Sequence, residues 1–124
     1  MTAEPTVHDW SSLPIDRPMP LIERQRIVGE RAMISRVRLA KGFVVAAHRH
    51  DNEQLAVVLS GRIRFTLGPE EDPSRRVETL TGGQTLLIPS GAPHGAEALE
   101  ETVILDIFSP PSEKTGVDAL RAAP

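Results

Sequence analysis

Three histidines and one glutamine are the residues of this sequence whose types and spacing are best suited to hold a metal ion. His48 and His50 stand two positions apart, Gln54 follows in the next segment, and His94 lies beyond a loop rich in proline and glycine. Imidazole nitrogen and amide oxygen both bind divalent transition metals, and the chain has no cysteine to supply thiolate. We therefore predict a site for one divalent ion, with nickel, zinc, manganese and iron all compatible with these donors.

The spacing of His48 and His50 indicates that both side chains lie on one face of a β-strand. Side chains two positions apart point to the same side, and their backbone positions are about 7 Å apart. Arg49 would then point the other way. Val44 and Ala46 would share the histidine face and form a small apolar wall beneath the site.

Two turns are expected to bring the remaining donors to the same point. The polar turn at residues 51–53 precedes Gln54, and the segment Pro89–Pro93 precedes His94. Proline fixes the backbone angle φ, so this second loop holds its imidazole at low entropic cost. We expect the four side chains to converge.

Short β-strands are the elements that must position these side chains. Apolar runs that alternate or are rich in β-branched residues, bounded by turn-forming residues, predict strands at 32–39, 43–50, 55–59, 63–67, 86–88 and 102–108. The stretch from Pro89 to Gly95 is predicted to be a loop. Regularly spaced short strands without a long helix favour an all-β sandwich or barrel.

The chain divides into three predicted parts. Residues 1–31 begin with four prolines in the first twenty positions and are expected to form an extended N-terminal arm. Residues 32–111 hold the predicted strands and form the barrel, and residues 112–124 form a C-terminal tail. A length of 124 residues with 40% hydrophobic residues suits one domain with one core.

Charge and hydropathy exclude several classes of partner. The net charge of -3 provides no basic excess, so we expect neither nucleic acid nor an acidic membrane surface as a partner. No apolar stretch approaches the roughly 18 residues that span a bilayer. We expect a cytoplasmic protein that binds a small molecule.

The sequence resembles the cupin superfamily in two motifs. The first motif reads Gly42, five residues, His48-Arg49-His50, three residues, Gln54, six residues, Gly61. The second motif reads Gly83, five residues, Pro89-Ser90-Gly91, two residues, His94. The resemblance implies a double-stranded β-helix, or jelly-roll barrel, with the metal ligands pointing inward. For a small cupin it also implies a homodimer.

One ligand position differs from the commonest cupin pattern. Gln54 stands where many cupins have glutamate. Three neutral imidazoles and a neutral amide leave the charge of a divalent ion uncompensated, so such a site should attract an anion. A carboxylate or hydroxy acid is the expected ligand, with the ion acting on it as a Lewis acid.

More narrowly, the sequence resembles the cupins of pectin and alginate breakdown that process unsaturated uronates, where a set of three histidines and one glutamine occurs. The likeness rests on His48–Gln54, Ile88–Gly95 and Asp106–Pro111. It implies that Asp106 and Phe108 face the metal and contribute to catalysis. Strand parity independently places both residues on one face together with Ile104.

The arginine that usually follows the two prolines in this group is replaced by Ser112. A uronate carboxylate would therefore lack its bidentate partner at that position. Arg36, Arg38 and Arg64 are candidates to replace it, and the sequence does not say which of them faces inward.

Two classes of function stay open on the sequence. The first is an enzyme of isomerase or tautomerase type that moves a proton on an unsaturated uronate or related sugar acid, with Asp106 as acid and base. Within the enzyme class, an iron-dependent dioxygenase is the rival. The second class is a non-catalytic barrel that binds a metal or small ligand, and Ser112 favours it.

Overall fold

The computed structural model describes residues 4–111, which are built almost entirely from β-strands. In chain order the elements are η1 (Trp10–Ser12), β1 (Ile22–Val28), β2 (Met33–Leu39), β3 (Val44–His48), β4 (Glu53–Ser60), β5 (Arg62–Leu67), β6 (Arg76–Thr81), β7 (Thr85–Ile88), β8 (His94–Ala98) and β9 (Thr102–Ser109). Within residues 4–111 no helix has the length and apolar character needed to cross a membrane. The expected C-terminal tail, including Ser112, lies outside the described residues.

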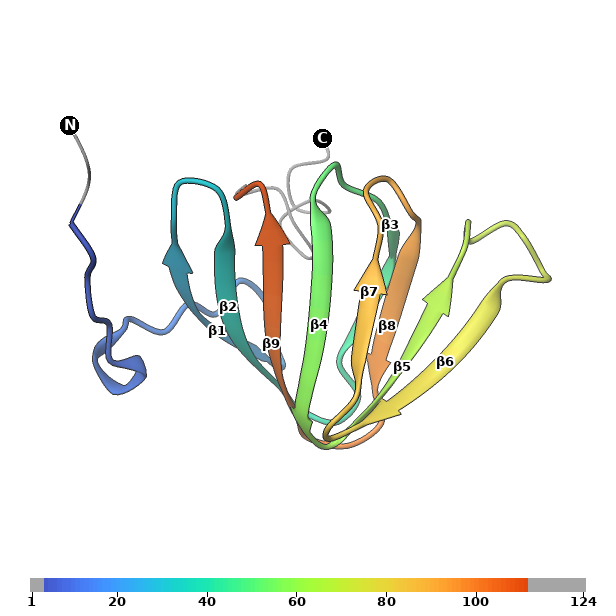
Figure 1. Ribbon diagram of the computed structural model, residues 1–124. Coiled ribbons are helices and arrows are strands. Elements are labelled where there is room, and N and C mark those ends of the chain that lie inside the picture. Colours follow the sequence, from blue (N-terminus) through green and yellow to red (C-terminus); the bar gives the residue numbers. More distant parts are fainter. Residues whose placement is uncertain (1–3, 112–124) are drawn as a thin grey trace.

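The strands form two antiparallel sheets arranged as a jelly roll. The larger sheet has the order β1-β2-β9-β4-β7, and the smaller has the order β3-β8-β5-β6. Most neighbours within a sheet are distant in sequence, and the strands converge toward the lower end of the molecule in Figure 1. The predicted all-β jelly-roll fold is confirmed.

The core lies between the inner faces of the two sheets and follows from strand alternation. In β5, Ile63 and Phe65 are buried, whereas Arg62 and Arg64 are exposed. The buried apolar side chains form one cluster: Ile22, Val37, Leu39, Phe43, Ala56, Val58, Ile63, Phe65, Leu80, Ala98 and Ile104. Removing these surfaces from water is the main stabilising contribution to a fold of this kind.

The six predicted strands are present, and three strands were not predicted. Strand β6 is exposed at five of its six positions, so it shows no apolar pattern. Strand β8 has the sequence His-Gly-Ala-Glu-Ala and begins at His94, inside the segment Pro89–Gly95 that was expected to be a loop. Strand β8 has no β-branched or aromatic residue of the kind that indicates a strand. Strand β6 has the β-branched residues Val77, Thr79 and Thr81, but their alternation does not separate an apolar face from a polar one.

The third unpredicted strand, β1, corrects the expected N-terminal arm. Residues 22–28 pair along their whole length with β2 and form the edge of the larger sheet. The strand was missed because its inward positions include a charged residue, Arg24, next to buried Ile22. The remainder of the arm packs against β1, since Gln25 donates hydrogen bonds to the carbonyls of Trp10 and Leu13.

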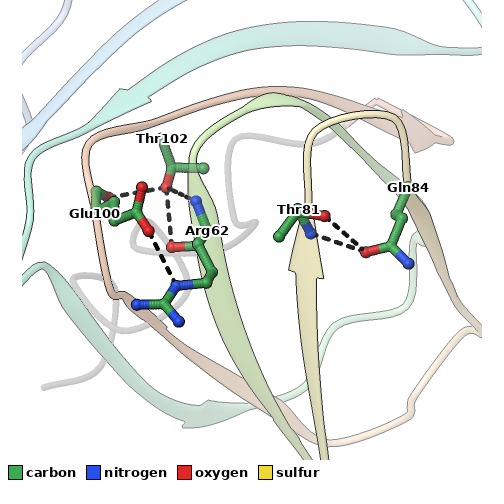
Figure 2. Close-up of polar contacts among 5 residues, drawn as sticks. All are labelled: Arg62, Thr81, Gln84, Glu100 and Thr102. Atoms are coloured by element: carbon green, nitrogen blue, oxygen red, sulfur yellow. Dashed lines mark hydrogen bonds and ion pairs between the residues drawn. The ribbon is translucent and has the colours of Figure 1, made fainter.

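Side-chain hydrogen bonds hold the turns that join the two sheets (Figure 2). The hydroxyl of Thr102, which is fully buried, accepts a hydrogen bond from the backbone of Arg62 and lies 2.9 Å from the carbonyl of Glu100. Arg62 also forms an ion pair with Glu100. At the β6–β7 turn the side-chain oxygen of Gln84 accepts a hydrogen bond of 2.8 Å from the backbone of Thr81.

Gly61, between β4 and β5, is expected to be intolerant of substitution. Its φ is +91°, and a Cβ atom there would overlap the carbonyl oxygen of Glu101 and the hydroxyl of Thr102. We expect Gly61→Ala to lower the free energy of unfolding by about 3 kcal/mol or more, measured by chemical denaturation. Gly83→Ala is the matched control, because its φ is +95° and no heavy atom lies within 4 Å of its Cβ position. The free energy of unfolding of Gly83→Ala should fall by only about 1 kcal/mol. Equal losses would contradict the steric explanation.

Candidate metal centre

The three predicted histidine ligands come together inside the barrel. One ring nitrogen from each of His48, His50 and His94 lies within 4.8 Å of the others. The ring centroids are 4.4 Å apart for His48 and His94, 5.0 Å for His50 and His94, and 5.7 Å for His48 and His50. His50 and His94 are buried and His48 is partly buried. Three imidazoles in this arrangement could hold a metal ion.

Pairing between β3 and β8 places two of these rings opposite each other. His48 is the last residue of β3 and pairs with His94, the first residue of β8. Strand β3 ends and β8 begins at the upper end of the molecule in Figure 1, where β4 also begins and β9 finishes. The cluster therefore forms where strands from both sheets reach one end of the barrel.

A β-bulge in β3 corrects the predicted wall beneath the histidines. Val45 pairs with Ala96 and His48 pairs with His94, so residues 46 and 47 together oppose Gly95. The extra residue reverses the parity of the strand. Val44, expected inside, is exposed, and Val45 lines the cavity instead.

Gly95 permits this bulge because the backbone of β3 passes close to it. A Cβ atom at Gly95 would lie 3.0 Å from the carbonyl oxygen of Val45 and 3.1 Å from the nitrogen of Ala47. These contacts are tighter than ordinary van der Waals packing. The bulge and the glycine together aim His48 at the cluster.

Each imidazole is oriented by a backbone carbonyl two residues away. Nδ1 lies 2.9 Å from the carbonyl oxygen of Ala46 in His48, 3.1 Å from that of Asn52 in His50, and 2.9 Å from that of Ala92 in His94. A backbone carbonyl can only accept a hydrogen bond, so it selects the tautomer with hydrogen on Nδ1. The lone pair is then on Nε2 of all three rings, which is the arrangement that metal-binding histidines use.

Asn52 fixes the loop between the first two histidines and Gln54. It is buried, and its side-chain amide donates to the carbonyl of Pro110, just beyond β9. Its own carbonyl lies beside Nδ1 of His50. The sequence predicts only that this residue belongs to a polar turn, and the tertiary structure shows that its amide ties the turn to the end of the last strand.

The donor atoms fit a bound cation. Nε2 of His48 is buried and has no hydrogen-bond partner among the described residues. Nε2 of His50 lies 3.1 Å from Oε1 of Gln54. Two ligands bonded at roughly 2.1 Å and at a right angle are about 3 Å apart, so this separation suits neighbouring ligands of one ion.

The amide of Gln54 connects the histidines to Asp106. Its Nε2 donates a 2.9 Å hydrogen bond to Oδ1 of Asp106, while its Oε1 faces His50. A glutamate at this position would place a second carboxylate against Asp106 and could not donate that bond. The glutamine that replaces the commoner glutamate is therefore compatible with a carboxylate at Asp106.

Asp106 and Phe108 lie where strand parity predicted. Both line the cavity of about 80 Å³ that contains His48, His94 and Gln54, and Ile104 lines it with them. The Phe108 ring meets His50 edge-on, with centroids 5.8 Å apart at 76°. The structure thus brings all six predicted site residues to one place.

Burial changes the pKa values of His48 and His94 in the same direction. Burial lowers the pKa of His94 to about 4, and it also lowers the pKa of His48. A lowered pKa favours the neutral form of both rings. The neutral imidazole is the form that binds metal.

The pKa of the Asp106 carboxyl group shifts in the opposite direction. Burial raises its pKa to about 6, while the hydrogen bond from Gln54 and the positive charge of Arg24 oppose the rise. A carboxyl group with a pKa near neutrality exchanges a proton at neutral pH more readily than an exposed aspartate does.

The two arginines that line the cavity were not among the three proposed from the sequence. Arg38 and Arg64 form exposed ion pairs with Glu101 and Glu97, so both point outward. Arg36 alternates with inward Ser35 and Val37 in β2 and lies on the outer face.

Arg24 and Arg26 of β1 line the cavity instead. Arg24 is almost fully buried and is paired with Asp16. Because β1 was assigned to the arm, no sequence argument could place these side chains. Their separation by two positions is the only sequence signal that they share a face.

Comparison with known proteins defines the class and then the family. The jelly-roll fold with an inward histidine cluster is that of the cupins. The family model described as "Cupin domain" (Cupin_2) matches residues 35–108, and the chain belongs to this family. No curated protein matches the chain.

Solved structures share the fold at low identity. An RmlC-like cupin from Shewanella frigidimarina is 21% identical, with a TM-score of 0.78 over 92% of this chain and 98% of that one. KdgF from Halomonas sp. is 24% identical, with a TM-score of 0.77 over 90% and 98% of the two chains. Oxalate decarboxylase from Lactobacillus farciminis, in a formate complex, is 20% identical with a TM-score of 0.74, over 98% of this chain and 40% of that one.

Removal of one imidazole should remove the metal. We expect His50→Ala to weaken the affinity for a divalent ion by at least about 100-fold, because one donor is lost and Gln54, whose Oε1 lies 3.1 Å from Nε2 of His50, loses its neighbour. Elemental analysis of purified protein and titration with zinc would measure this. His8→Ala is the matched control, since His8 is exposed in the arm and lies outside the cluster. Equal metal content in both variants and the wild type would rule out the site.

Proposed function

We propose that this chain is a metal-dependent cupin enzyme of isomerase or tautomerase type that acts on an unsaturated uronate or a related sugar acid. The observation that carries the proposal is the position of Asp106, whose carboxylate lines the same cavity as the histidine cluster and is held by Gln54. A carboxylate beside a sugar acid bound at a metal is placed to move a proton.

We assign Nε2 of His48, His50 and His94 and Oε1 of Gln54 as the donors to one divalent ion. When bound, the ion would supply Lewis-acid polarisation of a ligand oxygen. All four donors are neutral, so they leave the site positively charged. This charge favours a carboxylate or hydroxy acid over a neutral sugar.

The proton transfer itself falls to Asp106. In an enol-to-keto conversion the enol O–H bond breaks, C=O forms, and the C=C bond becomes single as a proton is added to carbon. Asp106 accepts the proton at Oδ2 and returns it to carbon, which regenerates the carboxylate. Gln54 holds Oδ1 throughout through its amide hydrogen.

Phe108 has a different part in the proposal. It is 4% exposed and packs edge-on against His50, next to Asp106 in the cavity wall. An aromatic ring at this point excludes water from the carboxylate and the reacting carbon. Exclusion of water strengthens the electrostatic contacts inside the cavity.

Three observations support a small anionic ligand. The oxalate decarboxylase from Lactobacillus farciminis that shares this fold was solved as a formate complex. The motifs around His48, His94 and Asp106 resemble those of cupins that process unsaturated uronates, which supplies the substrate class. The positive charges of Arg24 and Arg26 line the same cavity.

Loss of the Asp106 carboxylate should abolish turnover without releasing the metal. Asp106→Asn has the same shape and can still accept from Gln54, so the cavity is preserved. We expect the rate of loss of the conjugated absorbance of a 4,5-unsaturated uronate to fall by at least about 100-fold. Asp72→Asn, in an exposed loop, is the control and should retain full activity.

The same assay separates the rival functions. Equal activity of Asp106→Asn and wild type would contradict the proposed role of Asp106. A wild type that binds uronates without converting them would indicate a non-catalytic binding protein. Iron as the dominant metal, together with oxygen consumption on adding substrate, would indicate a dioxygenase.

We also infer a homodimer, which uses the outer face of the larger sheet. Strand register aligns one apolar side chain from each of the five strands in a row across that face: Ile27, Ile34, Ile107, Leu55 and Leu87. Monomeric proteins rarely leave such a continuous apolar row in water. A second copy of the chain, packed by two-fold symmetry, would cover it.

Light scattering on protein separated by size would test this assembly. We expect the wild type at the mass of a dimer, and Leu87→Glu shifted toward the monomer because a charge would be buried at the interface. Val77→Glu is the matched control: Val77 is 51% exposed on the smaller sheet, against 55% for Leu87. A monomeric wild type would refute the homodimer.

A further inference from the structure

A polar row crosses the inner face of the larger sheet next to the proposed metal ligands. Arg26 pairs with Ser35, and Ser35 pairs with Asp106, so side chains from β1, β2 and β9 lie side by side in one row. Paired residues in neighbouring strands are about 5 Å apart at Cα. Arg24 lies one row further along the same face, opposite Val37. All four polar residues line the cavity of the histidine cluster.

Ser35 has a hydroxyl group that the fold itself does not use. The residue is 2% exposed, and its Oγ has no hydrogen-bond partner among residues 4–111. A buried hydroxyl without a partner is costly, and natural proteins rarely keep one without reason. Because Ser35 points into the cavity beside Asp106, a ligand in the cavity is the group that it can reach.

Arg24 is held rigidly at the same wall. Its guanidinium forms an ion pair of 2.5 Å with Asp16, and its side chain is 7% exposed, against 40% for Asp16. The two residues also exchange backbone hydrogen bonds of 2.8 Å in both directions, so both side chains lie on the inward face. An arginine fixed in this way presents a planar set of donors, which suits a carboxylate.

The charges of the wall favour a single carboxylate. Arg24 and Arg26 face Asp16 and Asp106, so arginines and acids balance and the surplus positive charge comes from the proposed metal. A dianion such as a phosphate would also be placed against Asp106. A carboxylate brings one negative charge and two acceptor oxygens, one for Ser35 and one for Arg24.

The space available fits one end of a sugar acid. The inner cavity of about 80 Å³ has room for only a few small groups. Arg24, Arg26 and Met33 also line an outer groove of about 490 Å³, together with Pro14 and other residues of the arm. The carboxylate and its neighbouring carbons fit the inner space, and the rest of the molecule extends into the groove.

We propose that Ser35 and Arg24 form a carboxylate-binding subsite that holds the acid group of the ligand beside Asp106. The subsite rests on the proposed function, since it names the group that recognises the sugar acid there. Arg24, in the first strand, takes the place of the arginine that uronate-processing cupins carry where this chain has Ser112. Asp16 is a positioning residue that anchors Arg24.

The test is calorimetric binding of D-galacturonate and D-galactose to the metal-loaded protein. The two sugars differ only in carrying a carboxylate or a hydroxymethyl group. We expect the wild type to bind galacturonate at least tenfold more tightly than galactose. Ser35→Ala should weaken galacturonate binding about tenfold and Arg24→Gln at least tenfold, with galactose binding and metal content unchanged. Ser60→Ala and Arg38→Gln, both exposed, are matched controls that should behave as wild type.

Thermal unfolding separates a ligand-binding role of Ser35 from a structural one. Ser35→Ala removes an unpartnered buried hydroxyl, so the midpoint without ligand should be equal to or above that of the wild type, while stabilisation by galacturonate decreases. This variant also keeps the proposal testable if Arg24→Gln fails to fold.

The possible failures are distinguishable. If the wild type prefers galacturonate and both variants bind it equally well, the carboxylate is held elsewhere and only the subsite is overturned. If the wild type binds both sugars equally, the anionic ligand of the proposed function is wrong, and the subsite fails with it.

Discussion

The candidate site depends on the pairing of His48 with His94 across the β3–β8 ladder. This pairing brings the two cupin motifs, which are far apart in sequence, to adjacent positions at one end of the barrel. It requires the bulge in β3, since without the extra residue His48 would point away from the cavity. The close backbone approach at Gly95 is what allows the bulge. The three histidines form a cluster because of the register between β3 and β8, which their presence in the sequence alone does not ensure.

A series of polar contacts orients the side chains of the histidine cluster. Backbone carbonyls take the Nδ1 side of each imidazole and leave Nε2 facing inward. Gln54 links the histidines to Asp106, because its Oε1 lies beside His50 and its Nε2 donates a hydrogen bond to Asp106. A glutamine suits this position because its amide N–H donates to Asp106 while its Oε1 lies beside Nε2 of His50, where both atoms can face a bound ion. The proposed metal donors and the proposed proton carrier thus form one connected unit.

Alternation of side chains along the strands gives the larger sheet two different faces, an inner one that lines the cavity and an outer one that faces away from it. On the inner face it carries the polar row of Arg26, Ser35 and Asp106, and the apolar residues that close the cavity. On the outer face it carries the apolar row that would be covered in a dimer. Strand β1 adds Arg24 to the inner face, and the arm holds that residue through Asp16. An edge strand with a polar sequence therefore completes the binding wall.

The sequence by itself determined six of the nine strands described and, through the resemblance of its two motifs to the cupins, the jelly-roll class and the candidate donor set, because alternation and motif spacing are local properties of the chain. It also placed Asp106 and Phe108 on one face correctly, since β9 is regular between them. Parity failed at Val44 because a bulge depends on the partner strand, which the local sequence does not specify. Arg24 and Ser35 could not be assigned to the site for a similar reason. Their position in the wall arises from pairing of β1 with β2 and of β2 with β9, and only tertiary structure decides which strands pair.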